Sequence, residues 1–421
     1  MRGVVFSCVG DFSCSREEMR EELMSFVAGL ELAIYADAIS NSHSDGNILE
    51  AGVFFVSSPP RFRLLENRLL LEVDSSMTGP GYHVAMLNFM ESLEEGTSLR
   101  WDRGTLRDDT GYYEHRDFKR LQNFMRDWLL EYSRELLSSP LERDQLVRVN
   151  LTMPYTMRPR GYGGKICHSI GCFDRDFFTA LCEMEEKDLV CRAFFIWWEE
   201  GLNPEFYLKC ALNLIWCHIN WLPPELDREM AKYSLALKSL DLAWQGCQDM
   251  DFPVPEWIEI AELTHNKELA GELLRRFPTG ASQPPAKGFR RHDLLHTLGE
   301  NNWRIALPGR MHRIFNEEGT LFWDDRRRSI SISTSHSLGA DGRPLPAATL
   351  LENSLGGLPA ERRDLPLAPE VPAYILHEEG ESCSTTLFAA QSGHLVVVDV
   401  KYPASSQRAW ATALCDTLTA I

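Results

Sequence analysis

The chain has 421 residues, more than the roughly 250–300 at which a single hydrophobic core stops growing, so at least two domains are expected. Hydrophobic residues make up 44% and charged residues 25%, a composition that excludes a disordered or fibrous protein. The formal net charge is −18, and the residues before Lys287 contain 45 Asp and Glu against 29 Lys and Arg. Because a phosphate backbone is bound through Lys and Arg, this excess argues against nucleic acid and favours a basic partner, although a solvated acidic surface also explains it.

Cysteine usage indicates a reducing compartment. Eleven cysteines are present, an odd number, and several such as Cys210 and Cys217 lie in apolar stretches, so we expect free thiols and a cytoplasmic location. Cys167 and Cys172 are separated by four residues rather than the two of a zinc knuckle or redox pair. We therefore expect no metal and no cofactor. Charged residues interrupt the longest apolar stretch, 189–219, so no membrane-spanning segment is expected.

The first 138 residues alternate between helix and strand patterns. Ser15 and Glu18 have the form of a capping box, and the apolar spacing that follows predicts a helix over about 15–35. Strands are predicted at 52–56 and 63–73. A turn at Gly79-Pro80-Gly81 precedes a predicted helix over 83–93, a polar loop over 94–109, and a long amphipathic helix over 117–138.

The middle of the chain is predominantly helical. A strand at 147–153 and a glycine-rich loop at 160–165 precede helical patterns over 174–276. Two of these helices, separated near Pro255, predict an αα-hairpin. The residues from Phe277 to Lys287 have the composition of a linker.

The residues after the linker change to strand patterns. A final helix is predicted over 405–419, with Trp410 on its apolar face. The predicted strands cover 302–307, 320–323, 329–334, 373–377, 384–389 and 395–402.

Two resemblances follow from these patterns. The run Asn302–Pro308, the strands around Trp323, and the last strand before the helix bearing Trp410 together resemble the Mog1/PsbP-like α/β/α sandwich over 288–421. This resemblance implies a binding module. The motifs Gly-Pro-Gly-Tyr-His at 79–83 and Thr-Gly-Tyr-Tyr-Glu at 110–114 resemble those of uncharacterised bacterial proteins, from which no function carries over.

We therefore expect an α+β protein. It comprises an N-terminal α+β domain over 1–173, a helical region over 174–276 packed on that domain, a linker over 277–287, and a Mog1/PsbP-like domain over 288–421.

The densest group of polar and aromatic residues follows two glycine-bearing turns. Tyrosine, histidine and carboxylate side chains presented together suit a small binding or acid–base site. They equally suit helix capping, with Asp117 as the cap of the helix that follows, and both interpretations stay open. The candidate site residues are Tyr82, His83, Asp108, Asp109, Tyr113, Glu114 and His115.

Other constellations carry weaker chemistry. His292 and His296 would share one face of a helix, as a metal site requires, although a surface turn explains them as well. The glycines and lysine of 161–165 lack the spacing and hydroxyl of a phosphate loop. Cys167 and His168 are adjacent and, on an extended segment, point to opposite sides.

No local motif of a common enzyme class occurs in the sequence. We therefore expect a non-enzymatic protein-binding or regulatory protein, such as an immunity or assembly factor that meets a basic partner. The alternative is a motif-poor hydrolase or transferase with its site near His83 and His115. That alternative requires these side chains to converge on one substrate atom.

Overall fold

The structure, a computed structural model, describes residues 3–29, 39–41, 48–51, 59–138, 146–278, 284–299, 302–315, 321–380 and 382–421. The predicted strand at 52–56 lies outside these residues. The chain folds into two compact units, and the protein contains helices and sheets in the α+β arrangement predicted. The first unit comprises Met1–Thr152, Tyr162–Ile219 and Pro223–Gly288, and the second comprises Met153–Gly161, Asn220–Leu222 and Phe289–Ile421.

The first unit begins with an antiparallel six-stranded sheet in the order β2-β3-β4-β5-β1-β6. Alternate residues of β1 and β5 are buried, so one face of these strands packs into the core. The range 94–109, predicted to be a polar loop, contains strand β6. Only Trp101 of that strand is buried, so its sequence lacks the alternation by which a strand is recognised. The strands are β1 Val5–Asp11, β2 Ile39–Asn41, β3 Ile48–Ala51, β4 Arg61–Leu64, β5 Arg68–Asp74 and β6 Arg100–Asp108.

Within the described residues, four helices accompany this sheet. The capping box of α1 is present, since the Ser15 hydroxyl accepts from the Glu18 amide at 3.2 Å and the Glu18 carboxylate accepts from the Ser15 amide at 2.8 Å. The helix ends at Ala28, earlier than predicted. Buried residues of α1, α2 and α4 share one core with β1, β4 and β5. The helices are α1 Arg16–Ala28, α2 Pro80–Gly96, α3 Tyr112–His115 and α4 Phe118–Ser138.

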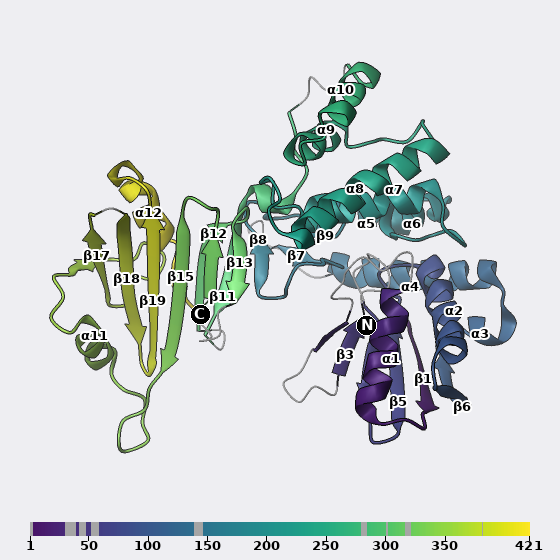
Figure 1. The fold of residues 1–421 in the computed structure, drawn as a ribbon, viewed down its shortest axis with the longest axis horizontal. Coiled ribbons are helices and arrows are strands. Elements are labelled where there is room, and N and C mark those ends of the chain that lie inside the picture. The colour runs from purple at the N-terminus through teal and green to yellow at the C-terminus, as the bar shows by residue number, and fades with distance from the viewer. Residues whose placement is uncertain are drawn as a thin grey trace. The chain divides into compact units, whose positions relative to one another are not determined.

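The helical part of the first unit follows, together with a small sheet in the order β10-β9-β7. Helices α7 and α8 lie side by side (Figure 1). Phe178 and Leu181 of α5 belong to the same apolar core as Leu129 of α4. The elements are β7 Val147–Arg148, β9 Ile166–His168, β10 Gly171–Phe173, α5 Arg175–Glu183, α6 Lys187–Phe194, α7 Pro204–Asn213, a π-helical turn at Leu214–His218, α8 Asp227–Gly246, α9 Val254–Leu263 and α10 Lys267–Arg276.

The second unit contains two antiparallel sheets, in the orders β20-β12-β11-β8 and β13-β14-β15-β19-β18-β17-β16. All the predicted C-terminal strands are found among its elements. They are β8 Met157–Pro159, β11 Asp293–Leu298, β12 Trp303–Pro308, β13 His312–Phe315, β14 Leu321–Asp324, β15 Ser329–His336, α11 Ala347–Leu355, β16 Glu361–Arg363, β17 Ala373–Glu378, β18 Cys383–Gln391, β19 His394–Tyr402, α12 Arg408–Cys415 and β20 Thr419–Ala420, with single 3-10 turns at Phe289–Arg291 and Ser405–Gln407.

Helices cover both faces of the seven-stranded sheet. Leu387 and Ala389 of β18 pack in one cluster with α12, whereas Phe388 and Ala390 pack in another with α11. Because neighbouring residues of a strand point to opposite faces, the two helices lie on opposite sides of the sheet. Strands β11 and β12 of the other sheet share the cluster on the α12 side.

The units do not follow the predicted ranges as continuous segments. Residues 153–161, predicted as part of the N-terminal domain, belong to the second unit, because β8 pairs with β11. A three-residue strand has no pattern that reveals such a pairing. Part of the predicted linker is also fixed, since the amides of Ala286 and Lys287 both donate to the Glu256 carboxylate at 2.7 Å.

The pair His292 and His296 does not share a helical face, because His296 lies in strand β11. Its side chain is buried, with its ring 5.2 Å edge-on from that of Trp323. Burial lowers the pKa of His296 to about 3. None of the helices that the structure describes has the length and apolar character that a membrane crossing requires.

Candidate functional site

The turn between β5 and α2 holds the motif Gly79-Pro80-Gly81 against a distant part of the chain. The Gly81 amide donates to the Trp197 carbonyl at 3.0 Å, and the Trp197 amide donates to the Thr78 carbonyl at 2.9 Å. Gly79 has a φ of 116°, and a Cβ on Gly81 would lie 2.1 Å from Cδ1 of Trp197. Gly79 is therefore required by its backbone conformation, and Gly81 by the close approach of Trp197. Pro80 begins α2.

The first turn of α2 directs His83 into the core. Its side chain is fully buried, with Nδ1 2.8 Å from the Ser75 hydroxyl and Nε2 3.2 Å from a carboxylate oxygen of Asp108. The rings of Phe6 and Tyr112 meet the imidazole edge-on at 5.3 Å and 6.4 Å. Because a carboxylate only accepts hydrogen bonds, Nε2 carries a proton toward Asp108.

Asp108, at the end of β6, is the acceptor at the centre of this group. Its carboxylate accepts from the amide and hydroxyl of Thr110 at 2.8 Å and 2.7 Å, and from the Tyr113 amide at 2.8 Å. Burial by itself raises the pKa of Asp108, but the hydrogen bonds from His83, Tyr113 and Thr110 hold that pKa well below its usual range. We call Ser75, His83, Asp108 and Thr110 the His83 network.

The His83 network has the order of groups of a nucleophile relay: acid, imidazole, hydroxyl. Ser75, however, is fully buried, and its hydroxyl donates to the Val4 carbonyl at 3.2 Å. The network ties together the residue before β1, the turn before α2, the end of β6 and the start of α3. Its geometry supports a structural role, and it offers a hydrolase or transferase no accessible reacting atom.

The other candidate residues separate into buried and exposed sets. Tyr82 is fully buried, and burial raises the pKa of its hydroxyl. The Asp109 carboxylate accepts from the Val5 amide at 3.3 Å. The Tyr113 ring lies 5.0 Å from the Arg116 guanidinium. Glu114 and His115 are exposed on α3, so the structure brings His83 and Asp108 together and leaves these two at the surface.

Capping by Asp117, the other interpretation of this region, is present in the structure. Its carboxylate accepts from the Arg120 amide at 3.0 Å, at the start of α4. This is the geometry of an N-cap, in which a side chain satisfies an amide that the helix leaves unbonded.

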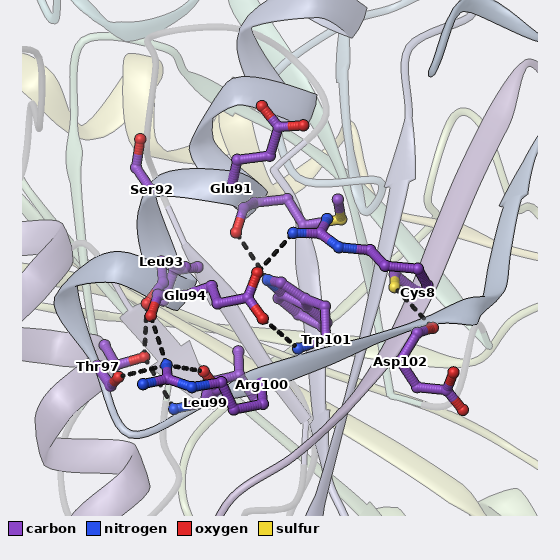
Figure 2. A network of polar contacts seen from close by, with 12 residues as sticks. Cys8, Glu91, Ser92, Leu93, Glu94, Thr97, Leu99, Arg100, Trp101 and Asp102 are labelled. Atoms are coloured by element: carbon purple, nitrogen blue, oxygen red, sulfur yellow. Dashed lines mark hydrogen bonds and ion pairs between the residues drawn. The ribbon is translucent and has the colours of Figure 1, made fainter. Parts of the chain in front are cut away.

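A second polar network fixes the opposite end of α2 (Figure 2). The Arg100 guanidinium donates to the carbonyls of Glu94 and Leu99 at 2.7 Å and 2.8 Å. The Trp101 amide donates to the Glu94 carboxylate at 3.0 Å, and its indole donates to the Met90 carbonyl at 2.7 Å. A cation at the last carbonyls of a helix is favourable, so α2 is held at both ends.

A surface hollow of about 840 Å³ lies between α4 and the turn joining α5 to α6. We call it the acidic hollow; it is lined by Arg126 and Asp127 of α4 and by residues 184–189. Two apolar side chains reach solvent there, since Met184 is 42% and Leu189 57% exposed. The acidic cluster at 183–188 is visible in the sequence, whereas the hollow depends on the packing of α4 beside these residues.

Some carboxylates of the acidic hollow form ion pairs and others do not. Asp188 forms ion pairs with Lys119 at 2.8 Å and with Arg126 at 3.5 Å, and these two cations lower the pKa of Asp188. Glu185 and Glu186 are exposed, and no side chain in the described ranges forms an ion pair with either. The described residues contain no group of three or more His, Cys, Asp or Glu side chains placed to hold a metal ion.

No protein-family model matches this chain, and no curated protein matches it in sequence. A crystal structure from Bacteroides thetaiotaomicron VPI-5482 is similar at 10% identity and a TM-score of 0.25, over 30% of this chain and 48% of that one. This chain therefore spans about half the length of that neighbour. The solution structure of cyanobacterial PsbP (CyanoP) from Synechocystis sp. PCC 6803 is similar at 11% identity and a TM-score of 0.24, over 30% of this chain and 91% of that one. These likenesses are weak and partial and say nothing about activity.

Proposed function

We propose that the first unit of this protein binds a basic segment of another protein at the acidic hollow. The observation that carries the proposal is that exposed carboxylates and exposed apolar side chains line the same hollow. The carboxylates are Glu185 and Glu186, and the apolar side chains are Met184 and Leu189. An apolar anchor surrounded by complementary charge is the usual composition of a binding surface. The occupant that fits is a segment carrying Lys or Arg beside one apolar side chain.

The charge of the hollow supports a basic occupant. Its lining contains four carboxylates, Asp127, Glu185, Glu186 and Asp188, against the two cations Arg126 and Lys187. Arg126 is already engaged by Asp188, so it does not neutralise the two exposed glutamates. The acidity of the surrounding part of the chain would also speed the approach of a positively charged partner.

The role that fits this surface is regulatory, as in an immunity or assembly factor that covers a basic region of its partner. A reducing, cytoplasmic setting is part of the proposal, supported by eleven cysteines that are all free thiols. We further propose that residues 288–421 form a Mog1/PsbP-like binding module, supported by the helices on both faces of the seven-stranded sheet.

Matched charge reversals test the proposed surface. One variant carries Glu185→Lys and Glu186→Lys in the hollow, and the control carries Glu17→Lys and Glu21→Lys on the exposed side of α1. Both change the net charge equally. Each purified full-length protein is used as bait in lysate from the cells that make it, and captured proteins are quantified by mass spectrometry.

We expect one basic protein to be captured by the unaltered protein and by the α1 control, and to be retained at least tenfold less by the hollow variant. A tenfold loss corresponds to about 1.4 kcal/mol of binding free energy, a modest demand on two reversed charges. If both variants lose captured proteins equally, net charge alone attracts them and the hollow is not the binding surface. If no captured protein differs in amount between the two variants, the proposal is also refuted.

A further inference from the structure

The hairpin formed by β9 and β10 places two thiols side by side. Cys167 and Cys172 are direct partners in the register, and their sulfur atoms lie 3.8 Å apart. Only Ser169 and Ile170 separate the paired ends of the two strands. The five-residue spacing that fits no zinc motif therefore produces a cross-strand pair.

Backbone geometry allows these thiols to join. Directly opposite residues of an antiparallel pair have Cα atoms about 4.5 Å or 5.5 Å apart, depending on the hydrogen-bonding position. Disulfides accept Cα separations of about 4.4–6.8 Å, so either position is suitable. A bond requires the sulfur atoms to approach to about 2.05 Å, which rotation of the two side chains can supply.

The hairpin is held in place by its neighbours. His168 is fully buried, and its Nδ1 accepts from the Ile170 amide at 3.3 Å. Its Nε2 lies 3.3 Å from the Asn150 amide nitrogen, which donates to the Met77 carbonyl at 2.9 Å. The two thiols are therefore preorganised rather than brought together by chance motion.

The two cysteines differ in access. Cys172 is partly exposed, whereas Cys167 is fully buried. The contact with Cys172 and burial raise the pKa of the Cys167 thiol, so Cys167 does not react first with a dissolved oxidant. The nearby Lys165 ammonium is paired with the Asp174 carboxylate.

We propose that Cys167 and Cys172 are a redox modification site that forms a reversible disulfide with a low-molecular-weight disulfide as oxidant. The Cys172 sulfur attacks one sulfur of that disulfide, which breaks and releases one thiol. The Cys167 sulfur then attacks the Cys172 sulfur and releases the second thiol. The two cysteine protons leave on the two released thiols, so two cysteines are oxidised while one disulfide is reduced.

Trypsin digestion isolates this pair for measurement. Cleavage after Lys165 and Arg175 yields one peptide, 166–175, with both cysteines and no other. The folded full-length protein is incubated with glutathione disulfide, acid-quenched, denatured, alkylated and digested. We expect most of this peptide to be two hydrogen atoms lighter and unalkylated, and dithiothreitol treatment before quenching to restore two alkylated cysteines.

Single variants assign the roles. Cys167→Ser should retain a glutathione adduct on Cys172, and Cys172→Ser should leave Cys167 unoxidised. Cys217→Ser is the control, because this buried thiol is nearby and donates to the Ser169 carbonyl at 3.6 Å. It should behave as the unaltered protein.

Three results overturn the proposal: full alkylation of both cysteines after oxidation, a stable glutathione adduct on Cys172 of the unaltered protein, or a link from either cysteine to Cys217. If Cys167→Ser does not fold, the unaltered protein and Cys172→Ser still decide the question.

Discussion

The His83 network and the acidic hollow are both polar and both belong to the first unit, but they differ in burial and pairing. Ser75 and His83 are fully buried, and each polar side chain of the network meets a hydrogen-bond partner. In the hollow, Glu185 and Glu186 are exposed and, within the described ranges, form no ion pair. The polar side chains of the His83 network are hydrogen-bonded within the fold, whereas the two exposed glutamates of the hollow can still bind a partner.

This difference separates a structural role from a binding role. A buried polar group costs free energy unless it is hydrogen-bonded, so a network such as that of His83 is satisfied within the fold. Tyrosine, histidine and carboxylate residues clustered in sequence therefore indicate either a site or a structural lock. Exposure distinguishes the two, and it supports the proposal that a partner binds at the hollow.

The largest effect is expected from a substitution that disrupts the turn positioning His83. Replacing Gly81 with Ala would place a Cβ 2.4 Å from the Glu199 carbonyl oxygen, so the backbone would have to move. We expect the variant to lose about 3 kcal/mol of unfolding free energy, the upper range for overpacking. Urea unfolding followed by tryptophan fluorescence measures this loss.

Gly271→Ala, in helix α10, is the matched control. Its new Cβ would meet only the flexible end of Arg275, at 3.6 Å. Because alanine stabilises a helix interior more than glycine does, this variant should gain about 0.5–1 kcal/mol of unfolding free energy. Equal stability of the two variants would show that the turn before α2 is not closely packed.

An intermediate effect is expected from Asp108→Asn, which removes the charged acceptor of the His83 network. We expect a loss of about 2–3 kcal/mol near pH 7, because hydrogen bonds to a charged group are lost and buried donors remain. The pKa of Asp108 is depressed in the folded protein, so its contribution is complete above the unfolded value of about 4 and disappears as pH falls through the folded pKa.

The stability gap between the unaltered protein and Asp108→Asn should therefore be constant from about pH 5 to 7 and narrow below about pH 4. Urea unfolding at several pH values measures the gap. A gap that does not change with pH would mean that the carboxylate is not ionised within the network.

Local signals in the sequence predicted many elements correctly. Ser15 and Asp117 cap the expected helices, and the apolar spacing after Asp117 locates α4. Among the C-terminal strands, β17 and β19 show alternating burial. These features depend on neighbouring residues, which is why a single sequence contains enough information to predict them.

Features that depend on distant residues could not be predicted in this way. The requirement for Gly81 arises from the side chain of Trp197 and the backbone of Glu199, and β8 gains its partner only when β11 folds beside it. Ser75 completes the His83 network without any motif that marks it, and Thr110 joins the network although it is not among the candidate site residues. The cross-strand contact of Cys167 and Cys172 likewise depends on a hairpin that the spacing alone does not reveal.

The smallest expected effect completes the comparison. The double variant Glu185→Lys and Glu186→Lys should unfold within about 0.5 kcal/mol of the unaltered protein, because exposed charges without close partners contribute little to stability. The same urea experiment measures it. A loss above about 1 kcal/mol would mean that these carboxylates stabilise the fold, as Asp108 does, and any loss of a captured partner would then reflect unfolding rather than a missing contact. Stability that is retained while capture is lost separates the two roles, because it assigns the carboxylates of the hollow to binding alone.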